Sequence, residues 1–210
     1  MSTPERAQQR RILIQSAIEL LLEEGPAAVS LRRVATNAGM STQMVYTLFG
    51  GKAGLFQAIY EEAFDRLDDA MTRAAEGLDH PQAQLVAMGM AYREFGLSHP
   101  TFYRVLFGRP VSEFSPPHAY EDRQRRAFTR MKDSIEACMA LGIYAELYDA
   151  ETITDVFWAT VHGLVSLELS GYWSSSEVAK ARYVAGLQAV GVGFAVDPTQ
   201  VLQARFLPDV

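Results

Sequence analysis

The amino-acid sequence predicts an all-α protein of about nine helices. Two observations carry this prediction. Apolar residues recur three or four positions apart through nearly the whole chain, and glycine or proline interrupts the pattern at intervals typical of helix ends. With 49% hydrophobic residues among 210, the chain can bury one good core or two modest ones, which excludes disorder throughout.

The chain begins with one long predicted helix and two short ones. Residues 10–25 carry one apolar stripe and end at a Gly-Pro pair. Ser30 and Ser41 are placed to cap two short helices, at residues 31–39 and 42–49. Two short helices joined at a glycine are the outline of a helix-turn-helix. The stripe of the first helix consists of Ile14, Ala17, Ile18 and Leu21.

The spacing inside the two short helices agrees with that outline. A steep crossing needs a small residue in the first helix, a residue tolerant of positive φ at the turn and a branched apolar residue in the second helix. Ala35, Gly39 and Val45 occur in this order. The exposed face of the second helix then carries amide, hydroxyl and methionine side chains that suit bases and phosphates in a major groove. We expect the DNA contacts to come from Ser30, Arg32, Thr42, Gln43, Met44, Tyr46, Thr47 and Lys52.

Charge is distributed unevenly along this chain, whose net formal charge is −6. Residues 1–54 carry six Lys or Arg and four Asp or Glu, which makes +2, whereas the remainder carries 13 and 21, which makes −8. The overall charge argues against non-specific coating of nucleic acid. The asymmetry indicates a small head that can approach a polyanion and a larger body with another role.

The stretch from Ile12 to about Phe64 resembles the DNA-binding head of the TetR family of bacterial one-component regulators. The motifs "SLRRVA", "AGMST" and "VYTLF", and Lys52 opening the next helix, carry the resemblance. It implies an all-helical homodimer whose recognition helices enter successive major grooves of a double-stranded DNA operator. It also implies a C-terminal domain that binds a small-molecule effector. The sequence departs from the family pattern at Leu48, Gly51 and Ala53, which weakens a helix cap and one phosphate contact.

The resemblance divides the chain into two domains. Residues 1–52 would form the helix-turn-helix DNA-binding domain, and residues 53–210 a helical regulatory, ligand-binding and dimerisation domain. Residues 109–121 are proline-rich, and we expect an irregular loop there that is able to cover a pocket. The later helices are expected near residues 52–77, 82–100, 101–108, 120–141, 150–170 and 176–194.

The body carries a second, narrower resemblance. Trp158, His162 and Gly163, with residues 99–108, are similar to the Trp-His-Gly signature of one C-terminal subfamily of these regulators. Aromatic and methionine side chains in the body would suit a mostly apolar ligand oriented by one or two hydrogen bonds, unless they simply fill the core. The predicted pocket residues are Tyr92, Phe95, Phe102, Tyr103, Phe107, Phe128, Met131, Trp158 and His162.

The last two predicted helices are so apolar that both need buried faces. Their small residues, such as Ala185 and Ala189, would let helices approach closely, and a four-helix interface between two copies satisfies both requirements, as the family implies. We expect this homodimer contact to involve Val161, Val165, Leu187 and Val190.

Composition and motifs exclude other classes. No apolar run reaches the roughly 18 residues of a membrane span, and the start is too polar for a signal peptide. We therefore expect a soluble, cytoplasmic protein. The single cysteine, Cys138, and four scattered histidines predict no metal site and no cofactor. The sequence contains no nucleophile elbow, phosphate-binding loop or HExxH motif, so we do not expect an enzyme. We expect a transcriptional repressor, and the alternative is a ligand-binding or scaffold protein without specific DNA binding.

Overall fold

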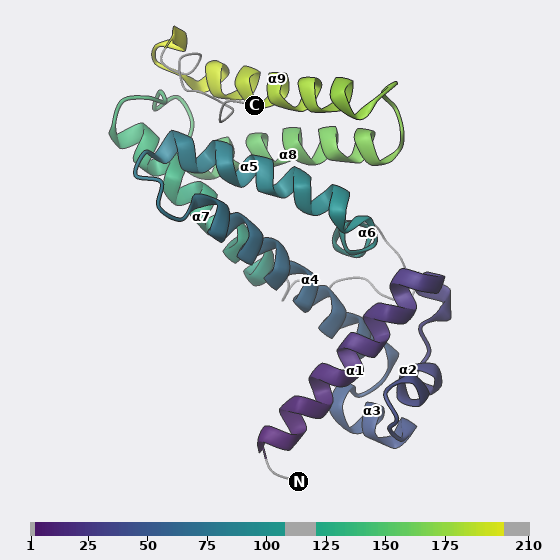
Figure 1. Cartoon of the computed structure of the whole chain (residues 1–210). Coiled ribbons are helices and arrows are strands. Elements are labelled where there is room, and N and C mark those ends of the chain that lie inside the picture. The colour runs from purple at the N-terminus through teal and green to yellow at the C-terminus, as the bar shows by residue number, and fades with distance from the viewer. Residues whose placement is uncertain (1–2, 108–120, 200–210) are drawn as a thin grey trace. The chain divides into compact units, whose positions relative to one another are not determined.

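A computed structural model describes residues 3–107 and 121–199. These residues form nine α-helices and no strand, so the all-α prediction is confirmed (Figure 1). No helix in this part of the chain is both long and apolar enough to cross a membrane. The predicted loop at residues 109–121 lies outside the described part except for Glu121, which begins a helix, and residues 200–210 lie outside it as well. The helices are α1 Thr3–Glu24, α2 Leu31–Asn37, α3 Thr42–Phe49, α4 Lys52–Ala75, α5 Pro81–Ser98, α6 Pro100–Phe107, α7 Glu121–Ala140, α8 Ala150–Leu169 and α9 Ser176–Phe194.

The helices belong to two compact units. The first comprises Met1–Asp65 with Thr101–Arg123, and the second Arg66–Pro100 with Gln124–Val210. The boundary therefore falls inside α4 rather than at its first residue, where the sequence-based division placed it. The first half of α4 belongs to the first unit because its apolar residues, such as Leu55, are fully buried there.

In the first unit, α1 packs on α2 and α3 (Figure 1). The predicted stripe of α1 is buried, as are Val34 and Ala35 of α2 and Val45 of α3. A buried hydroxyl links the first two helices, because Ser16 Oγ donates to the carbonyl oxygen of Val34 at 3.1 Å. Hydrophobic burial and this hydrogen bond together fix the position of α2 along the axis of α1.

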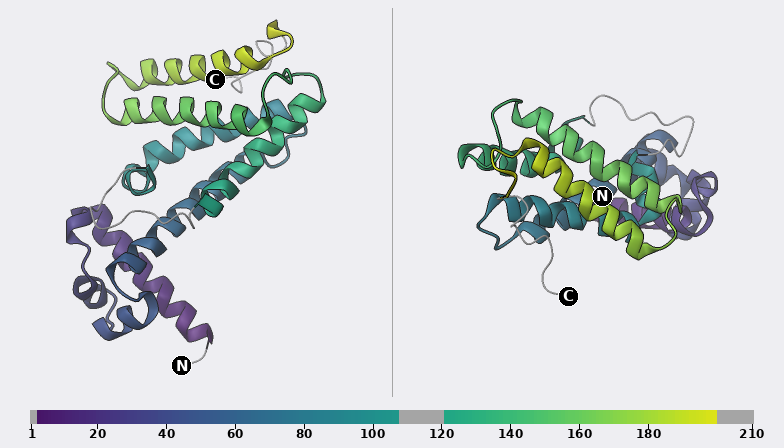
Figure 2. Two further views of the ribbon diagram at one scale, coloured as in Figure 1. Left: turned by 180° about the vertical axis from the view of Figure 1, so that it is seen from behind. Right: turned by 90° about the horizontal axis from the view of Figure 1, so that it is seen from above.

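The second unit is built around a helical hairpin. Figure 2 shows α8 and α9 running antiparallel, side by side. Gly186 permits their close approach, because a Cβ atom there would lie 2.5 Å from Leu164 Cδ1. The hairpin covers α5, where the hydroxyl of Tyr183 donates to the backbone carbonyl of Gly89. Small residues on two helices thus bring three helices into contact.

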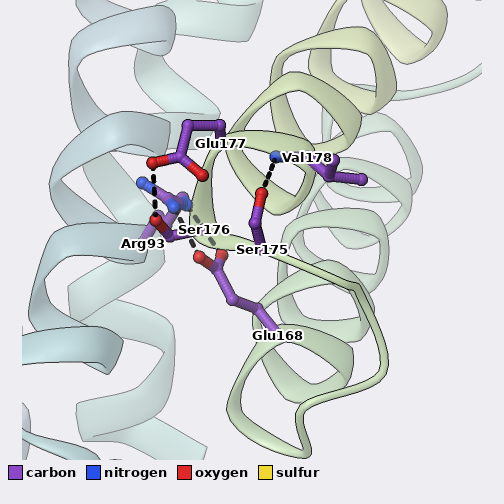
Figure 3. Close-up of polar contacts among 6 residues, drawn as sticks. All are labelled: Arg93, Glu168, Ser175, Ser176, Glu177 and Val178. Atoms are coloured by element: carbon purple, nitrogen blue, oxygen red, sulfur yellow. Dashed lines mark hydrogen bonds and ion pairs between the residues drawn. The ribbon is translucent and has the colours of Figure 1, made fainter.

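A buried ion pair also joins α5 to this hairpin. Arg93 Nε and Nη2 donate to the two carboxylate oxygens of Glu168 at 2.8 and 2.5 Å, and both side chains are only 9% exposed (Figure 3). The Arg93 guanidinium also lies 5.8 Å from the ring centre of Tyr183 in α9. One arginine from α5 is therefore held by both helices of the hairpin.

Candidate DNA-binding and effector sites

The turn between α2 and α3 has the geometry that its sequence predicts. Ser30 and Ser41 cap the two helices, since their Oγ atoms accept from the backbone N–H groups of Arg33 and Met44 at 3.3 and 3.2 Å. Gly39 in the turn has φ of 64°, in the left-handed region that a side chain disfavours. These local interactions begin α3 directly after the turn, in contact with α2, and its Val45 side chain is buried in the unit's core.

The outer face of α3 matches the set predicted to contact DNA. Gln43, Tyr46 and Thr47 are exposed, with Tyr46 at 51%, whereas Thr42 and Met44 are half-buried. Thr47 Oγ1 donates to the backbone carbonyl of Gln43 at 2.9 Å, which leaves its oxygen lone pairs as acceptors. The exposed face therefore offers an amide, hydroxyls and a thioether for a groove.

Two neighbouring arginines at the start of α2 have different environments. Arg33 forms a two-pronged ion pair with Glu24 of α1, and these hydrogen bonds hold the pKa of Glu24 below its usual value. Arg32 is exposed, and no ion pair of its side chain occurs within the described residues. Of the two, Arg32 is therefore the arginine whose guanidinium is not engaged within the described residues, and its contact with a phosphate stays a prediction.

The turn between α3 and α4 positions Lys52, the remaining basic residue that was predicted to contact DNA. Lys52 is the first residue of α4, and its Nζ lies 5.8 Å from the ring centre of Phe56. The turn is tight: a Cβ atom on Gly54 would lie 1.9 Å from the backbone oxygen of Phe49, the last residue of α3. Glycine at 54 therefore sets the distance between the end of α3 and the start of α4.

Sequence reasoning missed one residue that supports this turn. The guanidinium of Arg10 in α1 lies 5.5 Å from the ring centre of Phe49, and its Nη2 lies 3.6 Å from a carboxylate oxygen of Glu61 in α4. Arg10 thus holds the end of α3 and the first half of α4 against α1. The partners lie about 40 and 50 residues away in sequence, so no local pattern could have revealed them.

Four of the predicted pocket residues form one chain of contacts in the second unit. The hydroxyl of Tyr92 lies 3.1 Å from His162 Nδ1, within hydrogen-bonding distance. The Trp158 ring contacts His162 at 5.7 Å between ring centres, and Phe128 contacts Trp158 at 5.2 Å. Burial lowers the pKa of His162, so the neutral imidazole is favoured near neutral pH. We call Tyr92, Phe128, Trp158 and His162 the aromatic cluster.

The other five predicted pocket residues are divided between the two units. Phe95 and Met131 are buried in the second unit. Phe102, Tyr103 and Phe107 belong to α6 in the first unit, where Phe107 contacts both Tyr103 and Phe64 of α4 through edge-to-face rings. Within this unit, Phe102 and Tyr103 are buried in the core and Phe107 is half-buried.

The residues expected at the dimer interface are mostly buried within the protomer. Val161, Val165 and Leu187, three of the four residues expected at the dimer interface, are 0 to 4% exposed within the protomer, and Val190 is half-buried. Their side chains already pack inside the second unit.

The single cysteine is also buried. Cys138 is fully buried, which raises the pKa of its thiol to about 12. A thiol so protected is not a reactive sensor and packs as an apolar side chain.

Comparisons with known proteins agree with this geometry. A model of the bacterial regulatory proteins of the tetR family matches residues 13–59, and a model of the tetracyclin repressor-like C-terminal domain matches residues 85–190. The second match alone covers half of the chain. Neither description specifies the Trp-His-Gly subfamily, so that assignment stays a prediction.

Individual relatives agree with the family models. The HTH-type transcriptional regulator Rv1816 of Mycobacterium tuberculosis is 25% identical, over 81% of this chain and 84% of its own length. The HTH-type transcriptional repressor NicS of Pseudomonas putida is 24% identical, over 67% and 70%. A solved structure from Rhodococcus sp. RHA1 is 26% identical, covers 89% of this chain and 95% of its own, and superposes with a TM-score of 0.77.

The relatives are regulators rather than enzymes, and the motif that they share is the one whose caps, turn and exposed face are described above. The chain belongs to the TetR family and is a helix-turn-helix transcriptional regulator.

Proposed function

We propose that this regulator is a cytoplasmic, homodimeric repressor that leaves its operator when a small, mostly apolar molecule binds to its second unit. The observation that carries the proposal is the face of α3. This helix is capped at Ser41, anchored by the fully buried Val45 and exposes Gln43 and Tyr46 to solvent. A repressing rather than activating role is supported by the similarity to the repressor NicS.

Sequence readout and phosphate binding are assigned to different residues. Gln43 can pair with the N6 and N7 atoms of an adenine, and Met44 can pack on a thymine methyl group. Tyr46, Arg32 and Lys52 carry donors or positive charge toward phosphates, and the N-terminus of α4 adds its dipole beside Lys52. The affinity for the operator should therefore fall as the salt concentration rises. The preference for one DNA sequence over another should depend on the side chains of α3.

Binding can be measured by fluorescence anisotropy with a labelled DNA fragment from upstream of the gene. We expect a dissociation constant on the order of 10⁻⁸ M or tighter, loss of affinity as salt rises, and poor competition by a scrambled duplex. Folded protein that binds no native upstream fragment selectively would contradict the proposal. That result would favour the ligand-binding or scaffold alternative.

Gln43→Ala should change base discrimination. We expect the variant to lose about 1 to 3 kcal/mol of preference at one base-pair step, because the bidentate amide contact is removed. Tyr46→Phe should instead weaken binding equally across sequences, because a phosphate carries no sequence information. Titration of the operator and its single-base variants distinguishes the two effects. Gln57→Ala, an exposed amide on α4, is the matched control. An unchanged sequence preference in Gln43→Ala would remove Gln43 from the readout.

The dimer contact is proposed on the outward face of α8 and α9. Because Val161, Val165 and Leu187 are buried within the protomer, they support this face from behind rather than form it. The outward positions are small or apolar and exposed, and a Cβ atom on Gly163 would contact nothing within 4 Å. Such a face lets two hairpins pack closely as four helices. Its exposed or half-exposed residues include Val156, Ala159, Gly163, Leu167, Ala185, Ala189 and Gly193.

Ala189→Arg should convert the dimer into a monomer. Each copy would place an unpaired guanidinium in the interface, at a cost of about 3 kcal/mol or more. Sedimentation velocity over a range of concentrations would measure the change in the dimer dissociation constant, which should exceed 100-fold. Ala140→Arg on α7, also exposed in the protomer, is the control and should remain dimeric. A dimeric Ala189→Arg variant would place the interface elsewhere.

The effector site is proposed at the aromatic cluster. Trp158 and the Tyr92 hydroxyl lie against the neutral imidazole of His162, and Phe128 extends the ring surface beyond Trp158. An apolar ligand could stack on these rings while its polar group meets His162 or Tyr92. Phenol, indole and naphthalene are suitable probes. A probe that binds this cluster should weaken operator binding about tenfold or more, and Trp158→Ala should reduce its affinity. If the operator affinity is unchanged at a saturating concentration of a probe that binds, compounds of that class do not release the protein from its operator.

A further inference from the structure

The second unit contains a cavity that none of the residues of the aromatic cluster lines. It is a cleft of about 280 Å³ where the end of α4 meets α5 and α7. Each helix contributes residues spaced three or four positions apart, so that one face of each helix lines the cleft. No residue of the cleft belongs to the predicted pocket. The residues that matter below are Thr72, Glu76, Met88, Arg130, Asp133 and Ser134.

The floor of the cleft is ordered by buried contacts. Met88 is almost fully buried and Ser134 is 5% exposed. Ser134 Oγ donates to Gln84 Oε1 at 3.0 Å, and Gln84 Nε2 donates to the backbone carbonyl of Leu78 at 2.6 Å. The hydroxyl oxygen of Ser134 keeps lone pairs that can accept from a ligand. The floor thus offers one apolar surface and one fixed acceptor.

The rim carries charges of both signs that have no ion-pair partner in the part of the chain that the structure describes. Glu76, Asp133 and Arg130 are exposed, and within residues 3–107 and 121–199 none of them forms an ion pair. Two other charges on α7, Lys132 and Glu136, instead pair with each other at 3.6 Å. Arg130 and Asp133 are therefore the unpaired charges among residues 128–140 of this helix, and both line the cleft.

We propose that this cleft binds a small zwitterion with a primary ammonium group and a carboxylate. Glu76 and Asp133 would hold the ammonium group, and Arg130 the carboxylate. A short aliphatic spacer would lie on Met88. A cation alone would leave Arg130 without a counterion, and an anion alone would face two carboxylates. The volume, just below that of a drug-sized pocket, suits a molecule of amino-acid size.

The inference goes beyond the proposed repressor function because the cleft shares no residue with α3 or with the aromatic cluster. A bound zwitterion would link Glu76, at the end of α4, to α7 through Arg130 and Asp133. Its occupancy can be measured without DNA, so failure of operator binding and failure of this site are separate results.

Isothermal titration calorimetry of the full chain tests the proposal directly. The probes are glycine, 4-aminobutanoate and 6-aminohexanoate, and the controls are n-butylamine and butanoate, each of which carries one charge. We expect at least one zwitterion to bind at least tenfold more tightly than both singly charged controls. If no zwitterion binds at millimolar concentration, or if n-butylamine binds equally well, the proposal is overturned.

Variants at the rim locate the binding site. Arg130→Gln and Asp133→Asn each remove one charge from an exposed side chain, so both variants should fold. Each should weaken zwitterion binding at least tenfold. Glu136→Gln is the matched control, because it removes one charge from α7 outside the cleft and should leave the affinity unchanged. Equal affinity in the parent protein and both rim variants would show that the zwitterion binds elsewhere and would overturn the assignment.

Discussion

Glu168→Ala is expected to lower the free energy of unfolding by about 3 to 5 kcal/mol. The two Arg93–Glu168 hydrogen bonds lie in a site that is nearly closed to water, with both side chains 9% exposed. Without the carboxylate, the Arg93 charge stays buried and unpaired, and the cost of its lost hydration is no longer offset. Urea denaturation at fixed protein concentration measures the loss, since the stability of a dimer depends on concentration.

Two further variants identify the cause of that loss. Glu136→Ala breaks the exposed pair with Lys132, whose side chains are 43% and 54% exposed, and should cost only about 0.3 to 0.5 kcal/mol. The double variant Arg93→Met with Glu168→Leu should recover most of the stability, because apolar side chains of similar volume need no counterion. A Glu168→Ala variant no less stable than Glu136→Ala would contradict the account of a buried ion pair.

Gly54→Ala should destabilise the first unit by about 3 kcal/mol and weaken operator binding. The new Cβ atom would lie 1.9 Å from the backbone oxygen of Phe49, and a backbone atom cannot move aside as the tip of a side chain can. The end of α3 must therefore shift relative to Lys52. Urea unfolding measures the stability, and operator titration measures the loss of alignment between base and phosphate contacts.

The effect of Gly54→Ala should be specific to the close contact. Ala53→Ser changes the neighbouring exposed residue by one hydroxyl group and should leave both the stability and the operator affinity nearly unchanged. A Gly54→Ala variant with the unfolding midpoint of the parent protein would show that the turn can relax at little cost. The role assigned to Gly54 would then be wrong.

Much of the fold follows from local sequence. The ninth helix was expected at residues 176–194 and spans Ser176–Phe194, because Ser175 caps it and its apolar pattern is continuous. The helix-turn-helix could be recognised because serine caps, a turn glycine and alternating burial are determined within some 20 residues. The exposed side chains of α3 could be predicted for the same reason, since helical period decides which side chains of a short helix point outward.

Other features depend on residues far apart in sequence. Nothing in "RR" at positions 32 and 33 indicates that Arg33 is neutralised by Glu24 while Arg32 is exposed. Likewise, Val161, Val165 and Leu187 have the composition of an interface, but their burial against the protomer's own helices assigns the proposed contact to other residues of α8 and α9.

The sequence by itself determined the helices, the helix-turn-helix and the family, because capping, helical period and turn chemistry act over short distances. Only the tertiary structure decided which charges are paired and where each apolar side chain is buried. The Arg93–Glu168 pair joins residues 75 positions apart, and the rim charges of the cleft come from α7 and from the turn that follows α4. Such contacts depend on how helices pack, and packing is a property of the whole chain.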